Sequence, residues 1–252
     1  MIQKKIKFPK KKNLNFIKNY FNKFGILKFL KGERDSFKPD LIDLFRIHQF
    51  VILNKRITAL EFGCGWSTFI IKHALSLNKN KYLQDVRRLR KKNTFELFTI
   101  DNQKKFLNLT KKRCAKFLGK KNKINFTFSK CYMTKFNGRF ATEYKKMPIM
   151  NPDFIYLDGP DPFSVKKSVN SFNTKHLELM PMSCDILKIE PFLIPGTIIL
   201  IDGRTANANF LKNNLQRNWL YKRDKIFDQT VFFLNDRPLG NLNKLQLNFF
   251  KS

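Results

Sequence analysis

Four acidic residues each stand at the end of an apolar run with the composition of a β-strand. Asp101, Asp158 and Asp202 end the runs 95–101, 153–158 and 196–202, and Glu61 is the last residue but one of the run 57–62. A single Asp after a strand commonly begins a turn, but four acids at matched positions favour a shared sheet edge. Ligands of open α/β sheets bind at the carboxyl ends of the strands. The sequence therefore predicts a ligand site lined by carboxylates at this edge.

A glycine-rich turn follows the first of these strands. It reads Gly63-Cys64-Gly65 and runs into Ser67 and Thr68, which are good residues for a helix start. Glycines permit a sharp turn and let a ligand lie against bare main chain, as in a Rossmann-type nucleotide turn. Thr68 stands where the dinucleotide fingerprint has its third glycine. Glu61 suits a cationic ligand, such as the amino-acid end of S-adenosylmethionine, better than a pyrophosphate.

These motifs resemble those of class I S-adenosylmethionine-dependent methyltransferases, over about residues 57–234. Glu61-x-Gly63-x-Gly65 corresponds to the first motif of that superfamily, and Asp101 to its ribose-binding acid. The strand ends 157–160 and 201–203 resemble the small-molecule, catechol O-methyltransferase-like branch. The resemblance implies a Rossmann-like α/β fold, doubly wound, with a mostly parallel seven-stranded sheet and a C-terminal antiparallel strand pair. It implies that the cofactor is held by Glu61, Gly63, Gly65, Ser67 and Asp101.

The same branch implies a metal site. Acids at the ends of its fourth and fifth strands help to hold Mg²⁺, so Asp158 and Asp202 are the metal candidates by resemblance. Two positions depart from the pattern. Where the branch has a second metal ligand at the end of its fifth strand, this chain has Gly203, followed by Arg204. Where the branch has its catalytic lysine, this chain has Asp161.

The remaining candidates lie on loops. The segment 159–184 leaves the fourth strand and is expected to pass over the active-site edge, where long loops often carry binding groups. It places His176 as a candidate general base that takes a hydroxyl proton, with Asp158 and Asp161 as the other catalytic candidates. Cys131 follows a predicted strand at 123–130 and is expected near the adenine.

Composition leaves the acceptor open. Fifty Lys and Arg against nineteen Asp and Glu give a net charge of +31, which favours either a polyanion partner or the compositional bias of an AT-rich genome. We expect a small-molecule or sugar acceptor. One alternative is an RNA methyltransferase that uses the basic leader and the run 87–92, although no Asn-Pro-Pro-Tyr-like motif is present. The other is a non-catalytic nucleotide-binding scaffold on the same fold.

The chain divides into three predicted parts, a basic amphipathic extension (1–38), the methyltransferase-like domain (39–234) and a peripheral tail (235–252). Apolar residues between 16 and 30 recur at helical spacing. We expect this apolar stripe to pack on its own domain, on a partner or on a membrane surface. Helices are predicted at 40–54, 67–77, 103–118 and 185–192 and from 204, with 78–94 as an exposed charged link.

Cysteine spacing bears on the compartment. Cys64, Cys114, Cys131 and Cys184 are widely spaced and form no Cys-x-x-Cys pair, so neither a zinc signature nor a disulfide framework is expected. The chain also has no run of 18 apolar residues that predicts a membrane-spanning helix. We therefore expect reduced thiols in a cytoplasmic protein.

Overall fold

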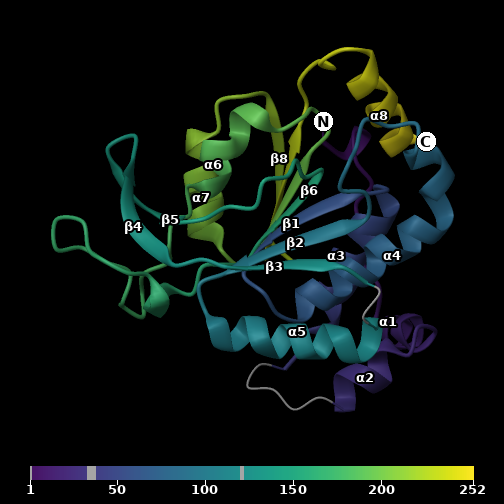
Figure 1. Ribbon diagram of the computed structural model, residues 1–252, viewed down its shortest axis with the longest axis horizontal. Coiled ribbons are helices and arrows are strands. Elements are labelled where there is room, and N and C mark those ends of the chain that lie inside the picture. The colour runs from purple at the N-terminus through teal and green to yellow at the C-terminus, as the bar shows by residue number, and fades with distance from the viewer. Residues whose placement is uncertain (1, 33–37, 120–121) are drawn as a thin grey trace.

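One seven-stranded sheet organises the protein (Figure 1). The computed structural model describes residues 2–32, 38–119 and 122–252. The strand order is β3-β2-β1-β6-β7-β9-β8; β3, β2, β1, β6 and β7 are parallel, and β9 pairs antiparallel with both β7 and β8. The strands are β1 (Thr58–Phe62), β2 (Glu96–Asp101), β3 (Ile124–Phe128), β6 (Phe154–Leu157), β7 (Ile198–Asp202), β8 (Trp219–Asp224) and β9 (Gln229–Leu234). This topology confirms the predicted fold class.

Helices cover both faces of the sheet (Figure 1). Helices α3 to α5 lie on one face, and α6 and α7 lie on the other. The helices are α1 (Leu14–Asn22), α2 (Ile26–Gly32), α3 (Leu41–Leu53), α4 (Trp66–Val86), α5 (Lys104–Leu118), α6 (Asp185–Ile189), α7 (Thr205–Asn214) and α8 (Asn241–Lys251), with 3₁₀ turns η1 (Ile2–Lys4), η2 (Pro162–Ser164) and η3 (Glu190–Phe192).

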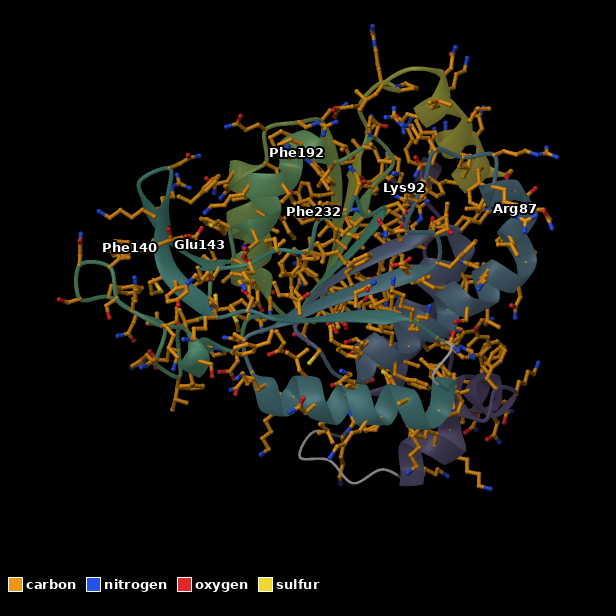
Figure 2. The ribbon with its side chains drawn as sticks, in the orientation of Figure 1. Arg87, Lys92, Phe140, Glu143, Phe192 and Phe232 are labelled. Atoms are coloured by element: carbon orange, nitrogen blue, oxygen red, sulfur yellow. The ribbon has the colours of Figure 1, made fainter. Side chains whose placement is uncertain are left out.

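Successive side chains along the strands point to opposite faces of the sheet and contribute to two hydrophobic cores. In β1, Ala59 packs on the α3–α4 side, whereas Leu60 and Phe62 pack on the opposite side. In β9, Phe233 and Phe232 divide in the same way, and Figure 2 shows Phe232 in the centre of the molecule. Strands buried on both faces read as continuous apolar runs, which is why the sequence located them well.

The N-terminal stripe packs on the protein itself. Gly25 adopts φ +69° and divides the stripe into α1 and α2. Ile17, Phe21 and Ile26 are buried in the core that α3 also contributes to. The face offered to a membrane or a partner is therefore largely covered by the chain's own α3. Residues 1 and 33–37 of the predicted 1–38 extension lie outside the described residues.

No helix in the described part of the chain is both long enough and apolar enough to cross a bilayer.

Three elements differ from the sequence prediction. Helix α4 continues to Val86 instead of ending near residue 77. The predicted tail contains α8, whose Phe250 ring lies 3.7 Å from the guanidinium carbon of Arg56. An antiparallel hairpin of β4 (Cys131–Phe136) and β5 (Arg139–Tyr144) was not predicted and projects from the sheet with Phe140 and Glu143 (Figures 1 and 2).

A buried ion pair fixes the amino end of β6. Lys91 belongs to the basic run that was expected to be solvated or to bind phosphate, but its side chain is only 6% exposed and lies 3.1 Å from Asp153. The Asp153 carboxylate also accepts hydrogen bonds from the backbone N–H groups of Ile57 and Thr58, at 2.9 and 3.1 Å. This carboxylate therefore joins β1, β6 and the loop before β2.

Asp153→Ala is expected to lower the free energy of unfolding by about 3–5 kcal/mol, because it leaves a buried lysine and two backbone donors without their acceptor. Urea denaturation measures the change. The matched control is Lys92→Met, since Lys92 is exposed beside Lys91, and it is expected to change stability by less than about 0.5 kcal/mol. Equal effects of the two substitutions would contradict this role of Asp153.

Candidate functional site

A cavity of about 410 Å³ opens at the carboxyl ends of the parallel strands. It brings together the turn 63–65, Asp101, Asp158 and Asp202, and is bounded by the start of α3 and by one side of α5. Ser67 and Asp161 also line it. Its volume lies within the range of small-molecule and cofactor sites.

The two glycines of the turn have different roles. Gly63 adopts φ +86°, and a Cβ built on it would lie 2.9 Å from the carbonyl carbon of Asp158. Its N–H donates to the carbonyl of Ile100 at 2.9 Å. A Cβ built on Gly65 meets nothing within 4 Å, although Gly65 lines the cavity. Gly63 thus lets two strand ends approach, and Gly65 leaves space that a ligand can use.

Glu61 lies behind the turn and does not line the cavity. Its carboxylate is fully buried and accepts hydrogen bonds from the hydroxyls of Ser67 and Thr68, both at 2.6 Å. The Thr68 hydroxyl in turn accepts the N–H of Gly65 at 3.0 Å. The expected direct contact of Glu61 with a cofactor is therefore not offered by this arrangement. Glu61 instead positions the turn and the start of α4.

Burial raises the pKa of Glu61 to about 8, which predicts a pH-dependent stability. The folded protein retains this proton above the pKa of the unfolded chain, so the associated stability is lost as pH rises from about 4.5 towards 8. Glu61→Gln keeps a neutral side chain at every pH. Its free energy of unfolding relative to wild type is expected to rise by a few kcal/mol between pH 5 and pH 9. A difference independent of pH, in urea titrations across this range, would exclude a buried protonated Glu61.

Asp101 joins the ends of β1 and β2. One carboxylate oxygen accepts the N–H of Cys64 at 2.9 Å and the other accepts the N–H of Gln103 at 2.6 Å. Burial raises its pKa. Each oxygen keeps a further acceptor site, and the residue lines the cavity. The geometry suits a carboxylate that accepts hydrogen bonds from a vicinal diol.

Asp158, directly after β6, and Asp202, at the end of β7, also line the cavity. The Tyr156 hydroxyl donates to Asp202 at 3.0 Å, and burial together with the charge of Asp158 raises the pKa of Asp202 to about 6. Arg204 contacts the Asp158 carboxylate at 3.4 Å and donates to its backbone carbonyl at 2.6 Å. Arg204 therefore holds the end of β6 against the end of β7.

The donor set does not fit the expected Mg²⁺. Divalent magnesium requires near-octahedral oxygen coordination, but Asp158 is already paired with Arg204. In the part of the chain that the structure describes, no group of three or more His, Cys, Asp or Glu is arranged to hold a metal ion. Gly203 supplies no side chain where the related branch has its additional ligand.

Two acids from α3 were not predicted as site residues. Asp40 caps α3 by accepting the N–H groups of Ile42 and Asp43, and both Asp40 and Asp43 line the cavity. Burial, with the charges of Asp202 and Asp40, raises the pKa of Asp43 to about 7. The sequence shows the helix start at Pro39-Asp40, but only the packing of α3 on α4 brings it to the sheet edge.

The cavity is acidic in a strongly basic protein. Six aspartates line it against Lys38, Arg113 and Arg204, while the whole chain carries a net charge of +31. Clustered carboxylates in a low-dielectric cleft attract cations and disfavour anions. The electrostatics of the site therefore favour a cationic ligand.

Three predicted residues have other surroundings. His176 is exposed, accepts the N–H of Glu178 at 3.2 Å and does not line the cavity. Cys131 is the first residue of β4 and is buried in the core. Asp161 lines the cavity, but its carboxylate caps η2 by accepting the N–H of Ser164 at 2.9 Å. The 159–184 segment begins at the cavity with Asp161 and then pairs with β4 through the backbone of Lys166, and His176 follows on an exposed stretch.

Comparison with known proteins gives only distant structural similarity. No protein-family model and no curated protein sequence matches the chain. The methyltransferase PaMTH1 of Podospora anserina, solved with SAH, is 13% identical, with a TM-score of 0.47 and coverage of 90% of this chain and 99% of that one.

Two bacterial structures give similar values. The O-methyltransferase TomG of Streptomyces achromogenes, involved in tomaymycin synthesis and solved with SAM, is 12% identical with a TM-score of 0.41, and 91% and 92% of the two chains are covered. The O-methyltransferase of Bacillus cereus, solved with SAH, is 10% identical with a TM-score of 0.44, and 94% and 100% are covered. These values assign no function to this chain.

Proposed function

We propose that this protein is an S-adenosylmethionine-dependent methyltransferase that acts on an oxygen or nitrogen of a small-molecule or sugar acceptor. The observation that carries the proposal is the acidic cavity, with a bare-backbone turn at one strand end and Asp101 at the next, in a protein of net charge +31. S-adenosylmethionine carries a sulfonium and an ammonium group, so this cavity suits it. A dinucleotide would place its negatively charged pyrophosphate beside the same aspartates, which would repel it.

The cofactor would lie along the turn 63–65. Gly65 leaves room for it, and Asp101 would accept hydrogen bonds from its ribose hydroxyls. Trp66, Phe106 and Leu109 form an apolar part of the lining that suits the adenine ring, in place of the predicted Cys131. The residues present therefore fit the group, and its bound form supplies an electrophilic methyl.

The acceptor would lie near Asp158 and Asp202. The Asp158 side chain is 53% exposed, and both residues line the cavity. Asp202, with its pKa of about 6, is largely ionised near neutral pH and can still take a proton. It would receive the proton that an acceptor hydroxyl releases. The site contributes chiefly by aligning the reactants and excluding water.

Isothermal titration with S-adenosylmethionine and, separately, with NAD tests this proposal. We expect one S-adenosylmethionine per chain with a micromolar Kd, no detectable binding of NAD, and the same affinity in Mg²⁺ as in EDTA. Absence of S-adenosylmethionine binding by a sample that shows a cooperative thermal transition would refute the proposal. Preferential binding of NAD would point to a different nucleotide enzyme.

A further inference from the structure

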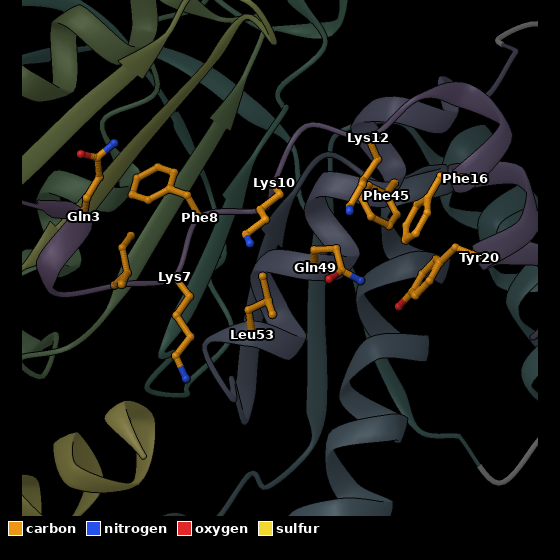
Figure 3. A pocket seen from close by; sticks show the side chains of 11 residues that line it. Gln3, Lys7, Phe8, Lys10, Lys12, Phe16, Tyr20, Phe45, Gln49 and Leu53 are labelled. Atoms are coloured by element: carbon orange, nitrogen blue, oxygen red, sulfur yellow. The ribbon is translucent and has the colours of Figure 1, made fainter.

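A second cavity, of about 590 Å³, lies between the N-terminal segment and α3 (Figure 3). In the described residues it shares no lining side chain with the cavity at the sheet edge. Phe45, Gln49 and Leu53 form its α3 side. These positions are four residues apart on one helix face and span about 12 Å at 1.5 Å per residue. The cavity is therefore elongated along α3.

Apolar side chains line this cavity on both sides. Ile6, Phe8 and Phe16 line it from the N-terminal segment, opposite Phe45 and Leu53. The Phe16 ring packs edge-on against Phe45, with an interplanar angle of 82°. Phe8 packs on Phe50 at 75° in the same manner. Both pairs have the edge-on arrangement that aromatic rings commonly adopt when they pack on one another.

Hydrogen-bonding capacity inside the cavity is limited. The Tyr20 hydroxyl is already bonded to Nδ1 of His48 at 2.8 Å, which leaves Gln3 and Gln49 as the uncharged polar groups of the lining. A ligand with many hydroxyl or amide groups would lose its hydration there without sufficient replacement. The lining thus favours a plain alkyl chain.

Lysines give the cavity its charge. Lys7, Lys10 and Lys12 line it, and no acidic residue does. Among the described residues, none of these lysines has an ion-pair partner. Figure 3 shows Lys10 and Lys12 extending from the N-terminal segment towards α3, and the Lys12 Nζ lies 4.5 Å from the centre of the Phe16 ring. An anionic group beside Lys10 and Lys12 would meet two cations that have no carboxylate partner among the described residues.

We propose that this cavity binds one free medium-chain fatty acid, with the alkyl chain along Phe45, Gln49 and Leu53 and the carboxylate at Lys10 and Lys12. The apolar groove accounts for the chain, and the absence of lining acids accounts for the single anionic end. This site is independent of the methyl-transfer proposal, because it lies outside the cavity at the sheet edge.

Isothermal titration of the full chain with sodium dodecanoate, kept below its critical micelle concentration, tests the proposal. We expect one dodecanoate per chain with a micromolar Kd. Dodecyl maltoside, which has the same chain and a neutral head, is expected to bind at least tenfold more weakly. Gln49→Trp, which fills the cavity, and the double substitution Lys10→Glu with Lys12→Glu are each expected to weaken dodecanoate binding at least tenfold.

The matched control is Lys23→Glu with Lys28→Glu, because both lysines are exposed in the same N-terminal region and neither lines the cavity. It should change the dodecanoate Kd by less than about twofold. Thermal melts confirm folding, and Gln49→Trp tests the site even if the double variant unfolds.

Three outcomes would overturn the proposal. The first is no dodecanoate binding by wild type. The second is equal weakening in the control, which would show attraction by net charge alone. The third is displacement of dodecanoate by a uridine oligonucleotide that binds more tightly, which would identify a single-stranded RNA site.

Discussion

Gly65→Val is expected to abolish S-adenosylmethionine binding while changing the free energy of unfolding by no more than about 1 kcal/mol. Gly65 has extended backbone, with φ 179°, and a Cβ at this position meets no atom within 4 Å. The added isopropyl group would therefore project into the cavity without displacing protein atoms. Titration calorimetry should show at least a 100-fold loss of affinity, and urea denaturation should show a nearly unchanged midpoint.

Gly63→Ala is the matched contrast, two residues earlier in the same turn. Its Cβ would lie 2.9 Å from backbone atoms of Asp158 and Gly159, at a φ of +86° that L-residues rarely adopt. We expect a loss of about 3 kcal/mol in unfolding free energy, from the combined clash and backbone strain. If both substitutions destabilised equally, or if Gly65→Val bound the cofactor normally, the assigned division of roles in this turn would be wrong.

Asp101→Asn is expected to weaken S-adenosylmethionine binding by roughly 10- to 100-fold, the range for losing charge-assisted hydrogen bonds. The amide oxygen can still accept one of the two backbone N–H groups that the carboxylate now accepts, so the turn should be largely retained. Titration calorimetry gives the affinity, and the thermal midpoint reports the fold.

Asp40→Asn is the control for overall charge. It removes one negative charge from the same cavity, and asparagine still caps a helix start. A loss of less than about threefold is expected. Equal losses in the two variants would mean that the cavity attracts the ligand by its summed charge and that Asp101 makes no specific contact.

Much of the fold was predictable because its strands are buried on both faces. The apolar runs that contain β1, β2, β6 and β7 were located from composition, and the acids at their ends fell at one edge because parallel strands share a direction. The Gly63-Cys64-Gly65 turn was also identifiable, since a positive φ and a close backbone approach require glycine at position 63.

Helix ends and loops were less predictable. Helix α4 continues to Val86 through polar residues. This is possible because its first turns are buried and the rest of the helix lies along the surface. The hairpin β4–β5 was not predicted: β4 alternates between buried and half-buried positions, but the burial of β5 follows no such period. His176 was assigned to the active-site edge on the assumption that its segment crosses that edge, whereas the segment pairs with β4 and His176 follows on an exposed stretch.

The order of the main strands and helices, the glycine turn and the acids near the strand ends could be read from the sequence, because these features depend on local composition and on periodicity along the chain. Which acids line the cavity depends instead on how the elements pack. The tertiary structure buried Glu61 against Ser67 and Thr68, paired Asp158 with Arg204, and brought in Asp40 and Asp43 from α3. Those outcomes depend on contacts between residues far apart in the chain, which set burial and charge pairing and therefore the chemistry of each carboxylate.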